Sequence, residues 1–190
     1  MEITKTLYIV NRRDWRKWLA KNWKKEKEVW LVYYRKESGK SRISYDDAVL
    51  EALCYGWIDS TVKGIDNQRY AQRFSPRRTN SLFSQMNKER VLQLIKDKKM
   101  TKAGFAALTY TPDFEERLII PADILRSLKK DKQVWQNFQN FSESYKRIRI
   151  AYIATRKRCG IEMYKKSLQH FIRMTAKNKR IGIVKEWNNR

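Results

Sequence analysis

The sequence is poor in the residues that bind metals, form disulfides and act as catalytic bases. It contains two cysteines, Cys54 and Cys159, and one histidine, His170, in 190 residues. Two cysteines cannot build a disulfide framework or a zinc cage, and a single imidazole argues against a histidine-based metal site. We therefore expect no metal and no cofactor. No set of nucleophile, base and orienting group can be assembled either, so the sequence favours a role without catalysis.

Long apolar runs are also missing. No segment approaches the roughly 18–20 apolar residues that a membrane span needs. The first five residues, MEITK, lack the apolar region and small-residue cleavage site of a secretory signal. These features predict a cytoplasmic protein without a transmembrane segment. A hydrophobic content of 42% with 7 Trp, 10 Tyr and 7 Phe indicates a folded chain rather than a disordered one.

Acidic residues are scarce. The chain has 43 Lys and Arg against 20 Asp and Glu, which gives a net charge of +23. Such a charge attracts polyanions without identifying which one. The excess is largest at the C-terminal end, where residues 142–190 hold 14 basic and 3 acidic side chains.

The order of the expected elements predicts an α+β fold. Residues 29–34, 57–63 and 69–74 are rich in β-branched and aromatic side chains, and they predict a small antiparallel sheet of about three strands. Helices are expected between these strands, and the chain after Pro76 is expected to be helical to its end. We expect an α+β core over residues 1–115 and a basic helical region over residues 116–190.

One polar segment suggests an anion site. The strand ending near Phe74 is followed by Pro76, by Arg77 and Arg78, and then by a helix expected to begin at Ser81. Unpaired N–H groups at a helix start favour an anion, and guanidinium groups and hydroxyls add charge-assisted hydrogen bonds. The predicted anion-binding residues are Arg73, Arg77, Arg78, Ser81 and Ser84.

Other interpretations of this segment stay open. Asp59 is expected to orient one of the arginines, and Trp57 and Tyr70 to form walls of the site. Alternatively, the arginines pair with carboxylates such as Asp59 and Asp66, and Ser81 only caps a helix. A third interpretation is an enzyme that draws on Asp59 and the arginines, which would require a deep pocket and a carboxylate of raised pKa.

The C-terminal helices form a second candidate surface. Basic residues recur at helical spacing on the side away from the expected apolar stripes. These possible nucleic-acid contacts are Lys146, Arg149, Arg156, Lys165, Lys166, Arg173 and Lys177. A basic face of this kind can follow a nucleic-acid backbone, lie on anionic lipid headgroups, or simply face solvent. No zinc-finger, RNP or KH motif accompanies it.

Several runs resemble a known family. Residues 51–60 (EALCYGWIDS), 70–78 (YAQRFSPRR), 81–91 (SLFSQMNKERV) and 100–104 (MTKAG) are similar to the YdeI/OmpD-associated family of small bacterial proteins. The resemblance covers roughly residues 5–110. It is looser from about Trp135 to Ile172, where Ile161-Glu162 replaces the Thr-Arg pair usual in the family.

The resemblance carries limited implications. It implies an α+β fold in a bacterial or archaeal protein, and it brings labels of bacteriocin or stress protection and porin association. It brings no catalytic residues to carry over. Its characteristic residues coincide with the arginine segment, which strengthens the hypothesis of a small anion or phosphate-containing ligand there, with nucleic acid as the alternative partner.

Overall fold

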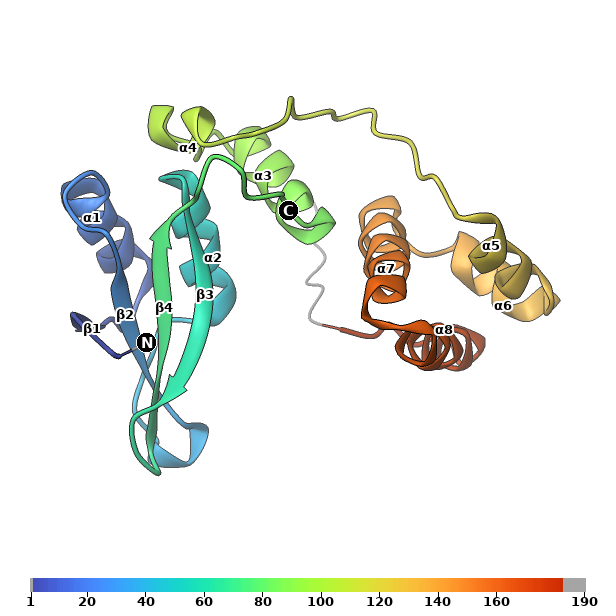
Figure 1. Cartoon of the computed structure of the whole chain (residues 1–190), viewed down its shortest axis with the longest axis horizontal. Coiled ribbons are helices and arrows are strands. Elements are labelled where there is room, and N and C mark those ends of the chain that lie inside the picture. The colour runs from blue at the N-terminus through green and yellow to red at the C-terminus, as the bar shows by residue number, and fades with distance from the viewer. Residues whose placement is uncertain (1, 183–190) are drawn as a thin grey trace. The chain divides into compact units, whose positions relative to one another are not determined.

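The structure is a computed structural model that describes residues 2–182 (Figure 1). The chain divides into two compact units. The first contains Met1–Leu82 and Arg90–Pro112, and the second contains Phe83–Glu89 and Asp113–Arg190. Within residues 2–182, none of the helices combines the length and apolar character needed to cross a membrane.

The first unit is built on a mixed four-stranded sheet in the order β1-β2-β4-β3. β1 (Thr6–Tyr8) runs parallel to β2 (Val29–Tyr34), and β4 (Arg69–Pro76) runs antiparallel to both β2 and β3 (Trp57–Gly64). The α+β class is therefore confirmed. The sheet has one strand more than the three expected, because the three-residue β1 is too short to show an alternating pattern.

Two helices connect the strands, and their ends are set by capping side chains and by a glycine. α1 (Arg12–Asn22) begins after Asn11, and α2 (Tyr45–Cys54) begins after Ser44, whose side chains accept the N–H of Asp14 and Asp47. α2 ends before Gly56, whose φ of +72° is the left-handed conformation expected of a helix stop. The short 3-10 helix η1 (Lys36–Ser38) lies between β2 and α2.

The core of the first unit is rich in aromatic residues. Trp15 of α1 lies edge-on to Phe74 of β4 with ring centroids 5.5 Å apart, and Trp18 lies edge-on to Trp57 of β3 at 5.8 Å. Trp15, Trp30, Trp57 and Phe74 are all at most 1% exposed. Full burial of several aromatic side chains supplies much of the driving force for folding this small unit.

The expected helix start at Ser81 is wrong. α3 (Gln85–Lys96) begins four residues later, and the hydroxyl of Ser84 accepts the N–H of Asn87. The N–H of Ser81 instead donates to the carbonyl of Arg78 in a turn, and the carbonyls of Ser81 and Leu82 accept hydrogen bonds from the Arg77 side chain. The backbone groups of Arg78, Ser81 and Leu82 therefore form hydrogen bonds of a turn and with a side chain, and not those of a helix.

The remaining helix of the first unit is short. α4 (Lys102–Ala106) begins after Thr101, whose hydroxyl accepts the N–H of Gly104.

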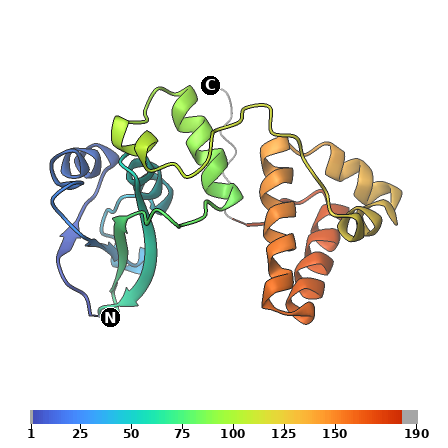
Figure 2. The same ribbon diagram turned by 45° about the horizontal axis from the view of Figure 1, so that its top comes forward.

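The second unit consists of helices around one apolar core. They are α5 (Ala122–Lys129), α6 (Lys132–Gln139), α7 (Glu143–Thr155) and α8 (Ile161–Ala176), with the 3-10 helix η2 (Arg156–Cys159) between the last two (Figure 2). The core cluster includes Ile124, Phe138, Tyr145, Ile153 and Phe171. Each helix contributes apolar residues at spacings of three and four, as the sequence pattern predicts for a packed helical face.

Candidate functional site

Arg73 forms an ion pair with Glu28, the residue that precedes β2. Its guanidinium Nη2 lies 2.6 Å from Oε2 of Glu28, and its Nε donates to the same oxygen at 2.7 Å. Hydrogen bonds from Thr4 and then from Arg73 hold the pKa of Glu28 below its usual value. Arg73 also donates to Ser60 and Ser75 at 3.2 Å. Its charge is compensated locally, so the candidate site described below does not include it.

Arg77 organises the loop that follows β4. Its Nη2 donates to the Ser81 hydroxyl at 3.2 Å and to the carbonyl of Leu82 at 3.0 Å, and its backbone N–H donates to the carbonyl of Gly56 at 2.9 Å. Partial burial lowers the pKa of the Arg77 guanidinium. Ser81 therefore accepts a hydrogen bond from Arg77, and this bond joins the two ends of the segment 77–81.

The other predicted residues, Asp59, Tyr70 and Ser84, each contact a different partner. The hydroxyl of Tyr45 donates to Asp59 at 2.6 Å, so this carboxylate binds a tyrosine where an arginine was expected. Tyr70 stacks on Tyr33 with ring centroids 5.3 Å apart and accepts a hydrogen bond from Arg42. Ser84 lies in the second unit, where it caps α3.

Three predicted residues, Trp57, Arg77 and Arg78, do line a common cavity in the first unit. The cavity has a volume of about 400 Å³. Its walls are Trp23, residues 55–57, residues 76–79, Ala103 and residues 106–109. These come from the end of α1, the turn between α2 and β3, the end of β4, and α4 with the segment after it. We refer to it below as the Arg77–Arg78 cavity.

Main-chain contacts shape this cavity. The N–H and the hydroxyl of Thr101 both donate to the carbonyl of Cys54, at 3.2 and 2.6 Å, which joins the start of α4 to the end of α2. A Cβ on Gly104 would lie 2.4 Å from that same carbonyl oxygen, and a Cβ on Gly56 would lie 2.6 Å from the Cβ of Ala107. The two helices approach this closely because both positions are glycine.

The lining combines positive charge with aromatic surface. Trp23, Tyr55 and Trp57 supply rings, and no aspartate or glutamate is among the residues that line the cavity. Arg78 is exposed, and within residues 2–182 its guanidinium has no carboxylate partner. A cavity with these walls can accept an anion that also carries an apolar or planar group.

Most of this lining was not predicted from the sequence. The pattern around Trp23 indicated only a helix, and Ala103 to Thr109 lie nearly fifty residues after Gly56 in the chain. The available signal was the run MTKAG at residues 100–104, which belongs to the family resemblance and contains the glycine that brings α4 against α2.

The expectation that Lys146 and Arg149 lie on a solvent-facing side of α7 is wrong. Lys146 and Arg149 are 8% and 9% exposed, and Lys146 forms an ion pair with Glu143 at 2.5 Å. Arg156, in η2, is half-buried. They are buried because α7 carries apolar or packed residues around most of its circumference, so spacing from one stripe did not identify a free side.

On α8 the predicted basic residues do face solvent. Lys165, Lys166, Arg173 and Lys177 are all exposed, the last immediately after the end of the helix. Lys165 forms an ion pair with Glu162 at 3.9 Å. Exposed pairs at this separation contribute little, so the face stays strongly cationic.

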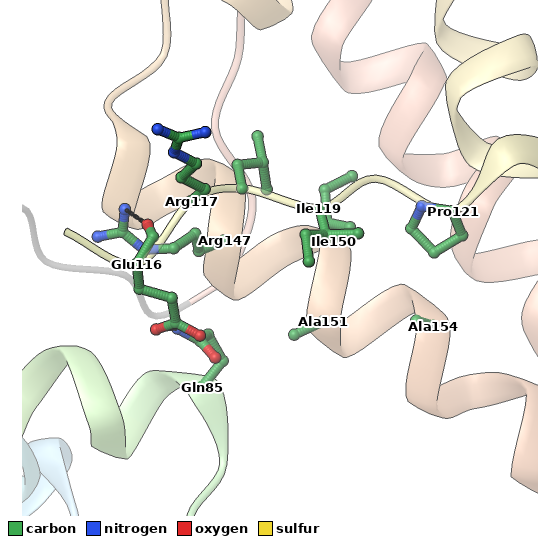
Figure 3. Close-up of a pocket in the computed structure, with 10 residues that line it drawn as sticks. Gln85, Glu116, Arg117, Ile119, Pro121, Arg147, Ile150, Ala151 and Ala154 are labelled. Atoms are coloured by element: carbon green, nitrogen blue, oxygen red, sulfur yellow. Dashed lines mark hydrogen bonds between the residues drawn. The ribbon is translucent and has the colours of Figure 1, made fainter. Parts of the chain in front are cut away.

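The second unit has a smaller cavity of about 170 Å³ (Figure 3). Ile119, Ile150 and Ala154 lie along its apolar side, and Gln85 and Glu116 lie at one end. There Gln85 Nε2 donates to a Glu116 carboxylate oxygen at 3.0 Å. The polar groups bind one another, and the space is smaller than typical ligand sites.

Neither Cys54 nor His170 has the surroundings of a reactive group in the described part of the chain. Burial raises the pKa of the Cys54 thiol to about 11, which keeps it protonated at neutral pH. His170 is exposed beside Arg173, with 3.1 Å between Nδ1 and the guanidinium. Over residues 2–182, no group of three or more His, Cys, Asp or Glu is placed to hold a metal ion.

Comparison with known families gives a match for each half of the chain. Residues 7–107 match the family described as Domain of unknown function (DUF8412), and residues 117–178 match the family described as Bacteriocin-protection, YdeI or OmpD-Associated. The second match falls in the helical region, whereas the resemblance was expected mainly from residues 5–110. No curated protein and no solved structure matches the chain.

Proposed function

The chain belongs to the DUF8412 family through residues 7–107 and to the YdeI- or OmpD-associated family through residues 117–178, and for it we propose a binding role without catalysis. The Arg77–Arg78 cavity takes a small anion that carries an apolar or aromatic group. The observation that carries this proposal is Arg78, an exposed guanidinium without a carboxylate partner in residues 2–182, on a cavity lined by three aromatic rings and no acid.

The two arginines have different parts in this proposal. Arg77 is held by Ser81 and Leu82, so it positions the loop and contributes positive potential. Arg78 has its guanidinium available to form a bidentate bond to a carboxylate or phosphate. The aromatic walls then bury the apolar part of the ligand, and the small side chains of Ala103 and Ala106 leave room for it.

Titration calorimetry with three probes tests the proposal. Phenyl phosphate carries both an anion and a ring, inorganic phosphate carries only the anion, and benzyl alcohol carries only the ring. We expect phenyl phosphate to bind best. Arg78→Gln should weaken it by about 10-fold or more, because a charge-assisted hydrogen bond contributes about 1.5–3 kcal/mol.

Two further variants complete this experiment. Arg13→Gln removes an exposed arginine on α1 that does not line the cavity, and its affinity should match that of the unaltered protein. Ala106→Trp fills the cavity from an exposed position and should abolish binding of phenyl phosphate. Equal affinity of Arg78→Gln and Arg13→Gln for phenyl phosphate would refute the proposal.

The exposed cations of α8 support a second candidate function, contact with nucleic acid. Lys165, Lys166 and Arg173 would neutralise backbone phosphates without reading sequence. Anisotropy of a labelled duplex, measured across a salt series, tests it. Reversing all three charges to Glu should reduce the slope of log K against log salt by roughly 0.9 for each phosphate that the protein no longer neutralises.

A matched control exists on α1. Arg13, Lys17 and Lys21 are exposed basic residues, and reversing them changes the net charge by the same amount. If the two triple variants reduce the slope equally, only net charge matters and α8 is not a binding face. If the duplex does not bind at low salt, this candidate function is eliminated.

A further inference from the structure

α7 and η2 carry two arginines stacked on one tyrosine. Arg149, Tyr152 and Arg156 are separated by three and four residues, so they lie along one side of the helix. The guanidinium carbon of Arg149 is 4.7 Å from the centre of the Tyr152 ring, and that of Arg156 is 5.3 Å from it. Both cations are held by the ring, and stacking leaves the N–H groups at the guanidinium edges free to bind an acceptor.

Neither arginine has a carboxylate partner in the described part of the chain. The side-chain Nε of Arg149 and that of Arg156 are both buried without a hydrogen-bond acceptor. Arg149 is only 9% exposed, and burial without a counter-ion lowers the pKa of its guanidinium. A buried charge is normally paired, because desolvation makes an unpaired one costly.

The neighbouring cations of α7 show the ordinary arrangement. Lys146 forms an ion pair with Glu143, and Arg147 forms an ion pair with Glu89 at 2.6 Å. Arg149 follows Arg147 by two residues and has no such partner within residues 2–182. The contrast indicates that the anion of Arg149 comes from outside the described chain.

The surroundings of Arg149 add positive charge. The N–H of Ile181 donates to the hydroxyl of Tyr145 at 2.9 Å, and the Arg180 guanidinium lies 6.0 Å from the ring of Tyr145. At Gly182 a Cβ would lie 2.7 Å from Nη1 of Arg149, so the chain passes directly against this guanidinium. Tyr152 itself is 43% exposed, which leaves an approach from solvent at the edge of its ring.

We propose that Arg149 and Arg156 hold a phosphate group at the edge of the Tyr152 ring. The ligand's oxygens accept from the guanidinium N–H groups of both arginines and from the tyrosine hydroxyl. An oxyanion with tetrahedrally placed oxygens can reach two guanidinium groups and a hydroxyl together, which a planar carboxylate does less well. The source is either free phosphate or a phosphate monoester, or the backbone of a nucleic acid, and all present anionic phosphoryl oxygens.

Inorganic phosphate is the first probe, titrated by calorimetry against chloride at equal ionic strength. We expect saturable binding, weakened by about 10-fold or more in Arg149→Met and in Arg156→Gln. Arg13→Gln removes an exposed arginine of the first unit and should bind inorganic phosphate as the unaltered protein does. The double variant Lys130→Gln, Lys132→Gln removes two exposed charges of the second unit and should also keep its affinity.

Thermal unfolding distinguishes phosphate binding by Arg149 from a purely structural role of this residue. Because methionine removes an unpaired buried charge, Arg149→Met should be at least as stable as the unaltered protein in chloride, yet lose the rise in Tm that phosphate produces. Arg156 is half-buried, so Arg156→Gln provides the same test if Arg149→Met fails to fold.

Two more probes identify the source. Glycerol 3-phosphate and a 12-nucleotide single strand are titrated separately, and an effect of Arg149→Met on either one supports the proposal and names its source. Phosphate affinity equal in Arg149→Met, Arg156→Gln and the unaltered protein would overturn it. Absence of saturable phosphate binding to the unaltered protein would overturn it as well.

Discussion

Gly104→Ala tests whether the contact between α2 and α4 holds the first unit together. The added Cβ would lie 2.4 Å from the carbonyl oxygen of Cys54 and 2.8 Å from its carbonyl carbon. Both atoms belong to the main chain, so no side-chain rotation relieves the overlap. α4 must move away from α2, and this movement weakens the two hydrogen bonds from Thr101 to the same carbonyl.

Two opposing effects set the size of the change. Alanine is favoured over glycine in a helix by up to about 1 kcal/mol, which stabilises the variant. Overpacking costs about 1–3 kcal/mol, and each weakened hydrogen bond costs about 0.5–1.5 kcal/mol. The unfavourable terms are larger, so we expect the free energy of unfolding to fall by about 1–3 kcal/mol.

Urea unfolding followed by tryptophan fluorescence measures this change, because Trp15, Trp18 and Trp57 report on the first unit. Gly64→Ala is the matched control. Gly64 lies in β3 with nothing within 4 Å of its added Cβ, so its stability should change by less than about 0.5 kcal/mol. If Gly104→Ala is as stable as Gly64→Ala, the close approach of α4 and α2 is not a constraint and the reasoning about the cavity wall fails.

Two further predictions concern the second unit. A hydrogen bond from Lys157 lowers the pKa of Asp123 to about 2. Its contribution to stability is therefore present above about pH 4 and is lost as the pH falls toward 2; Asp123→Asn should reduce the acid dependence of the urea midpoint there, and an unchanged dependence would contradict this. Arg147→Met leaves the carboxylate of Glu89, whose side chain is 5% exposed, without its arginine, and should lower the free energy of unfolding by about 3 kcal/mol in urea titrations. Arg117→Met, at an exposed position, should have little effect, and equal losses in the two variants would contradict a buried ion pair.

The local elements of the fold were predictable from local patterns. The strands expected at residues 57–63 and 69–74 occur at Trp57–Gly64 and Arg69–Pro76, because β-branched and aromatic residues fit a covered sheet. The caps of α1 and α2 follow from side chains that reach backbone groups three residues away. The start of α3 was mispredicted because the Arg77 side chain donates hydrogen bonds to the carbonyls of Ser81 and Leu82, which a helix beginning at Ser81 would use for its own backbone hydrogen bonds. Helix propensity does not reveal a side chain that competes for these carbonyls.

The candidate site was predictable only in part. Arg77 and Arg78 stood out because a charged pair follows the end of a strand, and they do line a cavity. The ion-pair partner of Arg73 could not be predicted from the sequence, because Glu28 is 45 residues away. The pairing of β2 with β4 brings the two residues together. Arg149 was assigned to a solvent face, because helical spacing does not report which sides of a helix are packed.

The construction of the Arg77–Arg78 cavity has a consequence for how the family can diversify. The carbonyl of Cys54 accepts hydrogen bonds from Thr101, and the carbonyl of Gly56 accepts one from the N–H of Arg77. These bonds to the main chain hold the segments that form the cavity walls in place. Tyr55, Thr79 and Thr109 line the space without forming any of these bonds. Under the proposed binding role, exchanges at such positions would alter the preferred ligand without changing the backbone contacts that form the cavity.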